Sequence, residues 1–175
     1  MESHCLENGD LLVSRTIHVL LCMLRETCSE EKLSSKSLRR LYPDPVKGMD
    51  GDENAESIRS DWKEFIEPDL QLENRTALET VMTDLEAVQR FEVEPEDGEE
   101  DEDGLYAIQI PPDHLEAWAN TLTQARVILT EEYQLAEGIS LADLEPAVER
   151  MLASQQCEIY AYLLELIVER LTESL

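Results

Sequence analysis

The stretch D-H-L-E-A-W-A-N-T-L-T-Q-A-R-V-I-L, from Asp113 to Leu129, decides the fold that the sequence predicts. Apolar residues recur along it at intervals of three and four, which is the period of a helix with one buried face. Asp113 and Glu116 have the spacing of a capping box, in which a side-chain oxygen accepts free backbone N–H groups at the helix start. The stretch therefore predicts a helix that begins after Asp113 and buries Trp118.

Further helices are expected upstream. The segment Asp10–Thr27 has a centre, I-H-V-L-L-C-M-L, that is apolar nearly all round and predicts a deeply buried helix. A shorter helix ends at L-R-R-L-Y-P, where Pro43 stops it. A third carries Trp62, and Pro68 precedes a fourth that covers about residues 69–89.

Apolar residues at helical spacing continue downstream from Leu144 to Leu171. This segment is compatible with one long helix capped by Asp143, or with two helices that break near Ser154–Cys157. Five or six helices with short connections predict a mainly α fold, a single-domain bundle over residues 1–175.

Alternation with a period of two, typical of strands, occurs on both sides of an acidic connector. The two expected strands form one short antiparallel β-hairpin that needs the bundle for support, because two strands alone are marginally stable. Their apolar residues are Phe91 and Val93 before the connector and Tyr106, Ile108 and Ile110 after it. Residues 95–104 carry like charges without an apolar anchor, so they are predicted to be a mobile acidic hairpin tip.

The formal net charge is −26, and residues 91–175 hold 21 acidic side chains against 3 basic ones. Binding to nucleic acid or to an anionic membrane requires Lys and Arg to neutralise phosphates, so neither partner is expected. A protein partner with a basic surface fits this charge. The acidic tip is either a solvated loop without function or the segment that binds such a partner, and the candidate residues are Glu99, Glu100, Asp101, Glu102 and Asp103.

Basic residues cluster once, at Lys32, Lys36, Arg39, Arg40 and Lys47. This cluster either binds an acidic partner, with Arg39 and Arg40 as candidate residues, or neutralises the protein's own acidic surface.

A separate cation, Arg126, lies near the apolar face of the Trp118 helix. A partly buried Arg requires a carboxylate, so a structural ion pair with a facing helix is expected.

No motif brings a nucleophile, a base and an orienting group together, and no glycine-rich phosphate loop or zinc-binding spacing is present. We therefore predict no catalytic, cofactor-binding or metal-ligating residues, and the sequence specifies no oligomeric state. The run Ile17–Leu24 is too short to span a bilayer and no signal peptide is visible, so a cytoplasmic protein with reduced thiols is expected.

Four segments together resemble a bacterial family that is classified as a domain of unknown function, number 2017 in its series. They are L-R-R-L-Y-P-D at Leu38–Asp44, E-P-D-L at Glu67–Leu70, the Trp118 helix, and the closing Y-A-Y-L-L-E-L-I-V-E-R-L. Family members tend to carry Asn-Asp where this chain has Thr123 and Gln124. The resemblance implies no activity. It implies a gene that in actinobacteria often lies beside that of the Clp protease adaptor.

Two functional hypotheses follow. The first is a cytosolic, non-catalytic protein-interaction module linked to regulated proteolysis. The alternative is a small enzyme, or a divalent-cation-dependent protein, that uses clustered carboxylates.

Deleting residues 96–103 and joining the ends with a short turn is expected to leave the fold intact, because a charged tip contributes no apolar burial. The free energy of unfolding from a denaturant titration should fall by less than about 2 kcal/mol. A larger decrease would show that the segment is structural.

Overall fold

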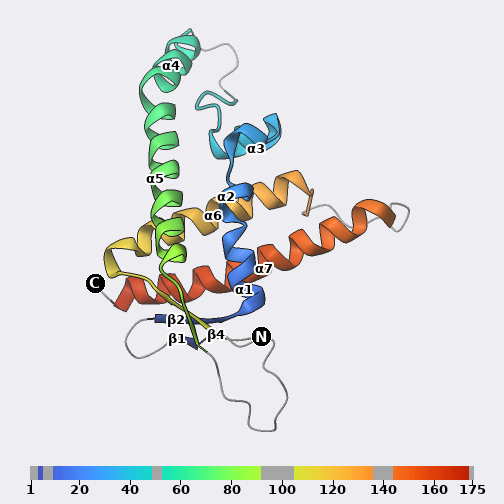
Figure 1. Ribbon diagram of the computed structural model, residues 1–175. Helices are drawn as coiled ribbons and strands as arrows, with labels where there is room; N and C mark the ends of the chain where they lie inside the picture. Colours follow the sequence, from blue (N-terminus) through green and yellow to red (C-terminus); the bar gives the residue numbers. More distant parts are fainter. Residues whose placement is uncertain (1–3, 6–9, 49–52, 92–104, 136–143, 174–175) are drawn as a thin grey trace.

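Helices make up most of the computed structural model, which describes residues 4–5, 10–48, 53–91, 105–135 and 144–173 (Figure 1). The α-helices of these ranges are α1 (Arg15–Cys22), α2 (Leu24–Thr27), α3 (Ser35–Leu41), α4 (Ala55–Asp61), α5 (Glu67–Glu86), α6 (Leu115–Glu132) and α7 (Leu144–Glu173). The predicted mainly α fold is confirmed. The single-domain prediction stays a prediction, and the predicted acidic tip, residues 95–104, lies outside the described residues.

Helices α6 and α7 lie side by side, and α5 packs against α6 (Figure 1). The predicted apolar face of α6 is buried, with Trp118 and Leu122 both completely inaccessible to solvent. Helix α7 adds Tyr160, Leu163 and Ile167 to the same core. It is one continuous helix from Leu144 to Glu173, which decides between the two readings of this segment.

The predicted capping box is wrong. Helix α6 begins at Leu115 with His114 as its N-cap residue, and His114 makes no side-chain capping hydrogen bond. Asp113 lies instead within a 3-10 turn, Pro112–His114. The two consecutive prolines favour this tighter turn, in which the His114 backbone N–H donates to the Pro111 carbonyl at 2.9 Å.

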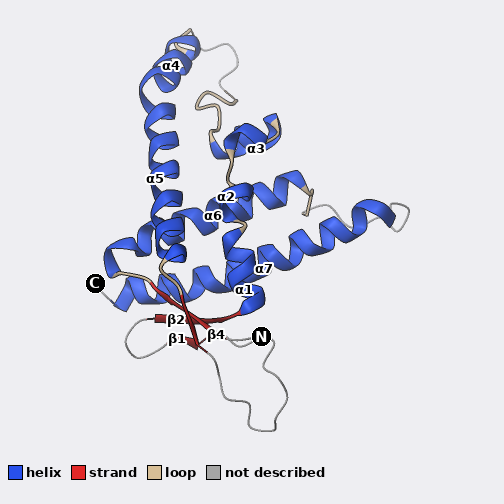
Figure 2. Ribbon diagram, viewed as in Figure 1, coloured by secondary structure: helices blue, strands red, loops and turns tan. Residues whose placement is uncertain are grey.

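The predicted hairpin pairing is confirmed for β3 (Gln89–Phe91) and β4 (Leu105–Gln109), which are antiparallel (Figure 2). The described strands form a larger sheet than a hairpin, because β2 (Asp10–Ser14) pairs with β4 and β1 (His4–Cys5) pairs with β2. In this order, β1-β2-β4-β3, every neighbouring pair is antiparallel.

Strand β2 corrects the expected helix Asp10–Thr27. Leu11 and Val13 are buried and Leu12 between them is partly exposed, which is the period of a strand. The strand ends and helix α1 begins at Ser14, because the Ser14 hydroxyl accepts the Ile17 backbone N–H at 3.5 Å as the N-cap of α1. Short apolar runs fit either structure, and the pairing with β4 selects the strand here.

A buried carboxylate connects α5 to α6. Asp84 is 7% exposed and accepts the Trp118 indole N–H at 2.8 Å. His114 Nδ1 lies 3.0 Å from the same carboxylate. These contacts provide hydrogen-bond partners for the Asp84 carboxylate, whose burial without partners would destabilise the fold. They therefore fix the position of α5 on α6.

The predicted ion pair of Arg126 is absent from the described residues. The Arg126 Nε atom is buried without a hydrogen-bond partner. The carboxylate that faces α6 from α5 belongs to Asp84, and Trp118 and His114 already occupy it.

Trp118→Ala is expected to lower the free energy of unfolding by about 3–5 kcal/mol, because it leaves a cavity and removes a donor from Asp84. Arg126→Ala should change it by less than about 1 kcal/mol, since no carboxylate of the described residues loses a partner. Denaturant titrations of both variants measure these effects. A loss of about 3 kcal/mol or more for Arg126→Ala would reveal a buried ion pair.

Candidate functional site

A short helix and the loop after it form one wall of the candidate site. Helix α3 is capped by the Ser34 side chain and ends at Leu41, with Tyr42 as its C-cap, because Pro43 disfavours helical backbone at the residue before it. The Asp44 carboxylate accepts the Val46 backbone N–H at 3.1 Å, which closes the loop into a turn. Val46 is thereby buried, and the loop is held against the rest of the molecule.

The opposite wall is a helical arm, which we define as residues 55–74. It consists of α4, a π-helical turn (Trp62–Ile66) and the first turns of α5. In the π turn the Glu67 backbone N–H donates to the Trp62 carbonyl, five residues back. Pro68 has no N–H to donate to the carbonyl of Glu64, which removes a regular α-helical bond at this point. Such π turns occur frequently at functional sites.

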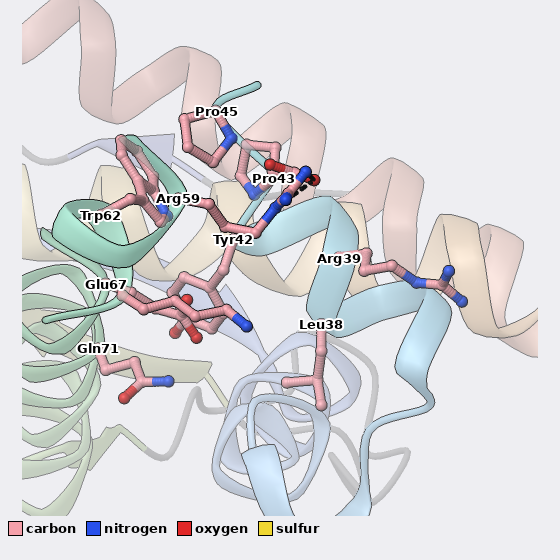
Figure 3. A pocket seen from close by; sticks show the side chains of 11 residues that line it. Leu38, Arg39, Tyr42, Pro43, Pro45, Arg59, Trp62, Glu67 and Gln71 are labelled. Carbon is pink, nitrogen blue, oxygen red and sulfur yellow. Dashed lines mark hydrogen bonds and ion pairs between the residues drawn. The ribbon is translucent and has the colours of Figure 1, made fainter. Parts of the chain in front are cut away.

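The two walls enclose a cavity of about 400 Å³, which we call the α3–arm cavity (Figure 3). Its apolar lining consists of Leu38, Tyr42, Pro43, Pro45 and Trp62. Aromatic and proline side chains provide rigid apolar surface, which suits the binding of an apolar group.

Charged residues at the cavity differ in how far they are neutralised. Arg59 contacts Asp44 at 3.2 Å and Glu56 at 2.8 Å, so its charge is matched within the protein. The pKa of Asp44 is held below its ordinary value by the Val46 N–H and by the Arg59 guanidinium. Lys63 also lines the cavity, and its charge contributes to the lowered pKa of Asp44 without a direct ion pair to that carboxylate.

The members of the basic cluster lie in different surroundings. Three of its members pair with the protein's own acids, namely Lys32 with Glu26 and both Lys36 and Arg40 with Glu131. Arg39 lies at the rim of the α3–arm cavity, where its Nε donates to the Ser35 carbonyl and its guanidinium points away from the cavity (Figure 3).

The two predicted candidates on α3 are thus separated. Arg40 faces Glu131 at 3.8 Å, whereas Arg39 is next to the cavity without a carboxylate among the described residues. The acidic candidates Glu99, Glu100, Asp101, Glu102 and Asp103 lie outside the described residues.

A chain of polar contacts extends from the cavity into the bundle. The Tyr42 hydroxyl donates to Glu30 at 2.5 Å and accepts from the Asn74 amide at 3.0 Å. The Gln124 amide on α6 donates to Asn74 at 2.9 Å and to Asn120 at 3.0 Å. These contacts tie α3, α5 and α6 together behind the cavity.

Sequence reasoning assigned Trp62 to a helix and did not find the cavity. Two features of the sequence lie near the residues that form the cavity. They are Pro68, which follows a helical pattern, and the prolines at positions 43 and 45. Neither signal shows that the two segments, about twenty residues apart in sequence, face each other.

Groups of three or more His, Cys, Asp or Glu side chains arranged for a metal ion are absent from the described ranges. Asp84 and His114 form a carboxylate–imidazole pair, but its other contact is to Trp118, a core residue. Within the same ranges, no helix is both long enough and apolar enough to cross a membrane.

The fold and the site define a mainly helical protein with a cavity between a short helix and a helical arm. A family model described as a domain of unknown function, DUF2017, matches residues 10–173. The chain belongs to this family, as its sequence motifs indicated. No curated protein and no solved structure matches it.

Tyr42→Phe is expected to change how stability depends on alkaline pH. Burial and the hydrogen bond to Glu30 raise the pKa of Tyr42 to about 12, whereas an unfolded tyrosine ionises near about pH 10. The stability that Tyr42 contributes is therefore complete below about pH 10 and is lost as the pH rises towards 12.

Denaturant titrations at about pH 9, 10 and 11 should show a shallower decline for Tyr42→Phe than for the wild type. Parallel declines in the two proteins would contradict the assignment.

Proposed function

We propose that this protein is a non-catalytic interaction module that binds a segment of another protein in the α3–arm cavity. The observation that carries this proposal is the combination of apolar walls, including Trp62 and Tyr42, with the exposed cation of Lys63 in the same lining. An apolar or aromatic anchor next to Asp or Glu residues would complement both features.

Charge supports an anionic ligand at this place. Of the three cations in the cavity lining, Arg59 is paired with Asp44 and Glu56 and the Arg39 guanidinium points away from the cavity, so the proposal depends on Lys63. Asp44 and Glu67 supply the cavity's only acidic groups among the described lining residues. The cavity is thus locally favourable for carboxylates on a protein that otherwise repels them.

The wider role that we propose is in regulated proteolysis, in the cytoplasm. Support for this link comes from the gene neighbourhood that the family resemblance implies, beside the Clp protease adaptor. For residues 99–103 we still propose binding to a partner protein with a basic surface.

The alternative is a small enzyme or a divalent-cation-dependent protein. The observation that favours it is the buried Asp84 carboxylate next to His114, since a carboxylate that orients an imidazole is a common catalytic arrangement. It would require a reacting group near the exposed part of His114, which is 33% accessible.

The binding proposal is tested by affinity capture with four forms of the protein: wild type, Trp62→Ala, Lys63→Glu and Lys47→Glu. Lys47 is an exposed member of the basic cluster that does not line the cavity. Lys47→Glu therefore makes the same change of charge outside the proposed binding site. Specific partners should be retained by wild type and Lys47→Glu and lost by the other two variants.

Peptide arrays of each captured protein then identify the bound segment. We expect segments that combine an apolar anchor with Asp or Glu, and a decrease in affinity of about tenfold or more for Trp62→Ala. Partners that bind equally to all four proteins, or that bind through basic segments, would refute the proposal.

A further inference from the structure

A groove of about 670 Å³ lies between α5 and the start of α6, and we call it the α5–α6 groove. One wall is a face of α5 between Asp69 and Thr80, and the other extends from Asp113 to Asn120 at the start of α6. The two helices pack together, and α5 continues beyond α6 (Figure 1). The groove shares no lining residue with the α3–arm cavity.

The hollow exists because small side chains line its middle. Ala77 of α5 and Ala117 of α6 both line the groove, and Ala77 is 6% exposed. Methyl groups leave space between two helices that larger side chains would fill. Leu70 and Leu72 add apolar surface on the α5 side, where Leu72 is 61% exposed. The groove therefore offers apolar contact surface to a ligand.

Hydrogen bonds between the helices hold the two walls in place. The Asn120 amide donates to the Asn74 side-chain oxygen at 3.4 Å, and the Gln124 amide donates to the same oxygen at 2.9 Å. Asp84 accepts the Trp118 indole N–H at 2.8 Å further along α5. Because α5 and α6 are already fixed to each other, a ligand does not have to order them, which lowers the entropic cost of binding.

Four carboxylates line the groove, and Lys, Arg and His are absent from its described lining. Asp69 and Glu73 belong to the α5 wall, whereas Asp113 and Glu116 belong to the opposite wall. All four residues are exposed, and none forms an ion pair with a cation of the described residues. The groove thus has negative charge on both walls that no lining cation neutralises.

Helix stability accounts for only part of this charge. Asp69 and Glu116 lie in the first turns of α5 and α6, where negative charge stabilises a helix. The positive end of a helix dipole corresponds to about half an elementary charge, so the α6 end does not neutralise both Asp113 and Glu116. Glu73 lies beyond the first turn of α5 and has no such role. Negative charge therefore remains for a ligand.

The arrangement of the carboxylates selects the kind of cation. A bound metal ion requires several oxygen ligands that converge on one point. No group of three or more acidic, His or Cys side chains in the described ranges is arranged in this way. A Lys or Arg side chain instead combines a long alkyl stem with a charged end. That combination matches an apolar groove that has separate carboxylates on both walls.

We propose that the α5–α6 groove binds a segment of another protein that carries several Lys or Arg residues. The alkyl stems would pack on Ala77, Ala117 and Leu72, and the charged ends would pair with carboxylates of both walls. A second copy of this chain is disfavoured as the occupant, because it has 40 acidic side chains against 14 basic ones. The inference does not depend on the α3–arm cavity, for which we propose an acidic ligand.

The test measures the binding of a synthetic peptide in which lysine alternates with serine. A peptide with diaminobutyrate in place of lysine has the same number of amines on shorter stems, so it tests the apolar contact. Spermine tests a small polyamine as the occupant. Binding to the full-length protein is followed by fluorescence anisotropy of the labelled peptides and by competition with spermine, near physiological salt, where attraction between distant charges is screened.

Two protein variants change the groove in different ways. Glu73→Gln with Glu116→Gln removes one charge from each wall, and Ala117→Leu fills the groove without changing its charge. The matched controls are Glu79→Gln with Glu165→Gln, and Thr123→Leu, at exposed positions outside the groove lining. The affinity for the lysine peptide should fall about tenfold or more in both groove variants and stay unchanged in both controls. Unchanged melting temperatures would show that the variants fold.

Nuclear magnetic resonance of the wild type locates the peptide. The side-chain amide signals of Asn74 and Asn120, which line the groove, should shift on addition of the lysine peptide. The indole signal of Trp62 in the α3–arm cavity should not shift.

Five results would overturn the proposal. They are no binding of the lysine peptide, equal binding of the diaminobutyrate peptide, equal weakening by the control variants, unchanged binding to Ala117→Leu, and spermine binding as tight as that of the peptide. The last result would identify a small polyamine, rather than a protein segment, as the occupant.

Discussion

The buried carboxylate of Asp84 is the constraint on which the arrangement of the helices depends. It is 7% exposed and must be hydrogen-bonded, because an unpaired buried charge would destabilise the fold by several kcal/mol. Trp118 supplies an indole N–H at 2.8 Å and His114 an imidazole nitrogen at 3.0 Å. Since Trp118 is at the centre of the buried face of α6, these contacts permit one placement of α5 on α6.

That placement determines where the candidate site forms. Asp84 anchors the C-terminal part of α5, and Asn74, further towards its start, contacts Tyr42 and Gln124. The helix beyond Asn74 continues through the π turn into α4, away from the sheet (Figure 1). Two polar attachments on α5, Asp84 in the core and Asn74 at Tyr42, therefore position the arm relative to α3 and α6.

The basic side chains of this acidic protein are used in different ways. Most of the basic cluster is used internally, as shown by the pairs of Lys36 and Arg40 with Glu131. Arg39 and Lys63, which make no direct ion pair with a described carboxylate, both line the α3–arm cavity.

The sequence by itself determined the helical class, the buried face of α6 and the pairing of β3 with β4, because each rests on a local period of apolar residues. It did not determine the role of Asp10–Ser14, since a short apolar run becomes a strand only when β4 offers free hydrogen-bonding groups. It also predicted that Arg126 pairs with a carboxylate of a facing helix, whereas the Asp84 carboxylate of α5 contacts Trp118 and His114. Cavities, exposed helix ends and buried hydrogen bonds depend on residues distant in sequence, so only the packed structure decided them.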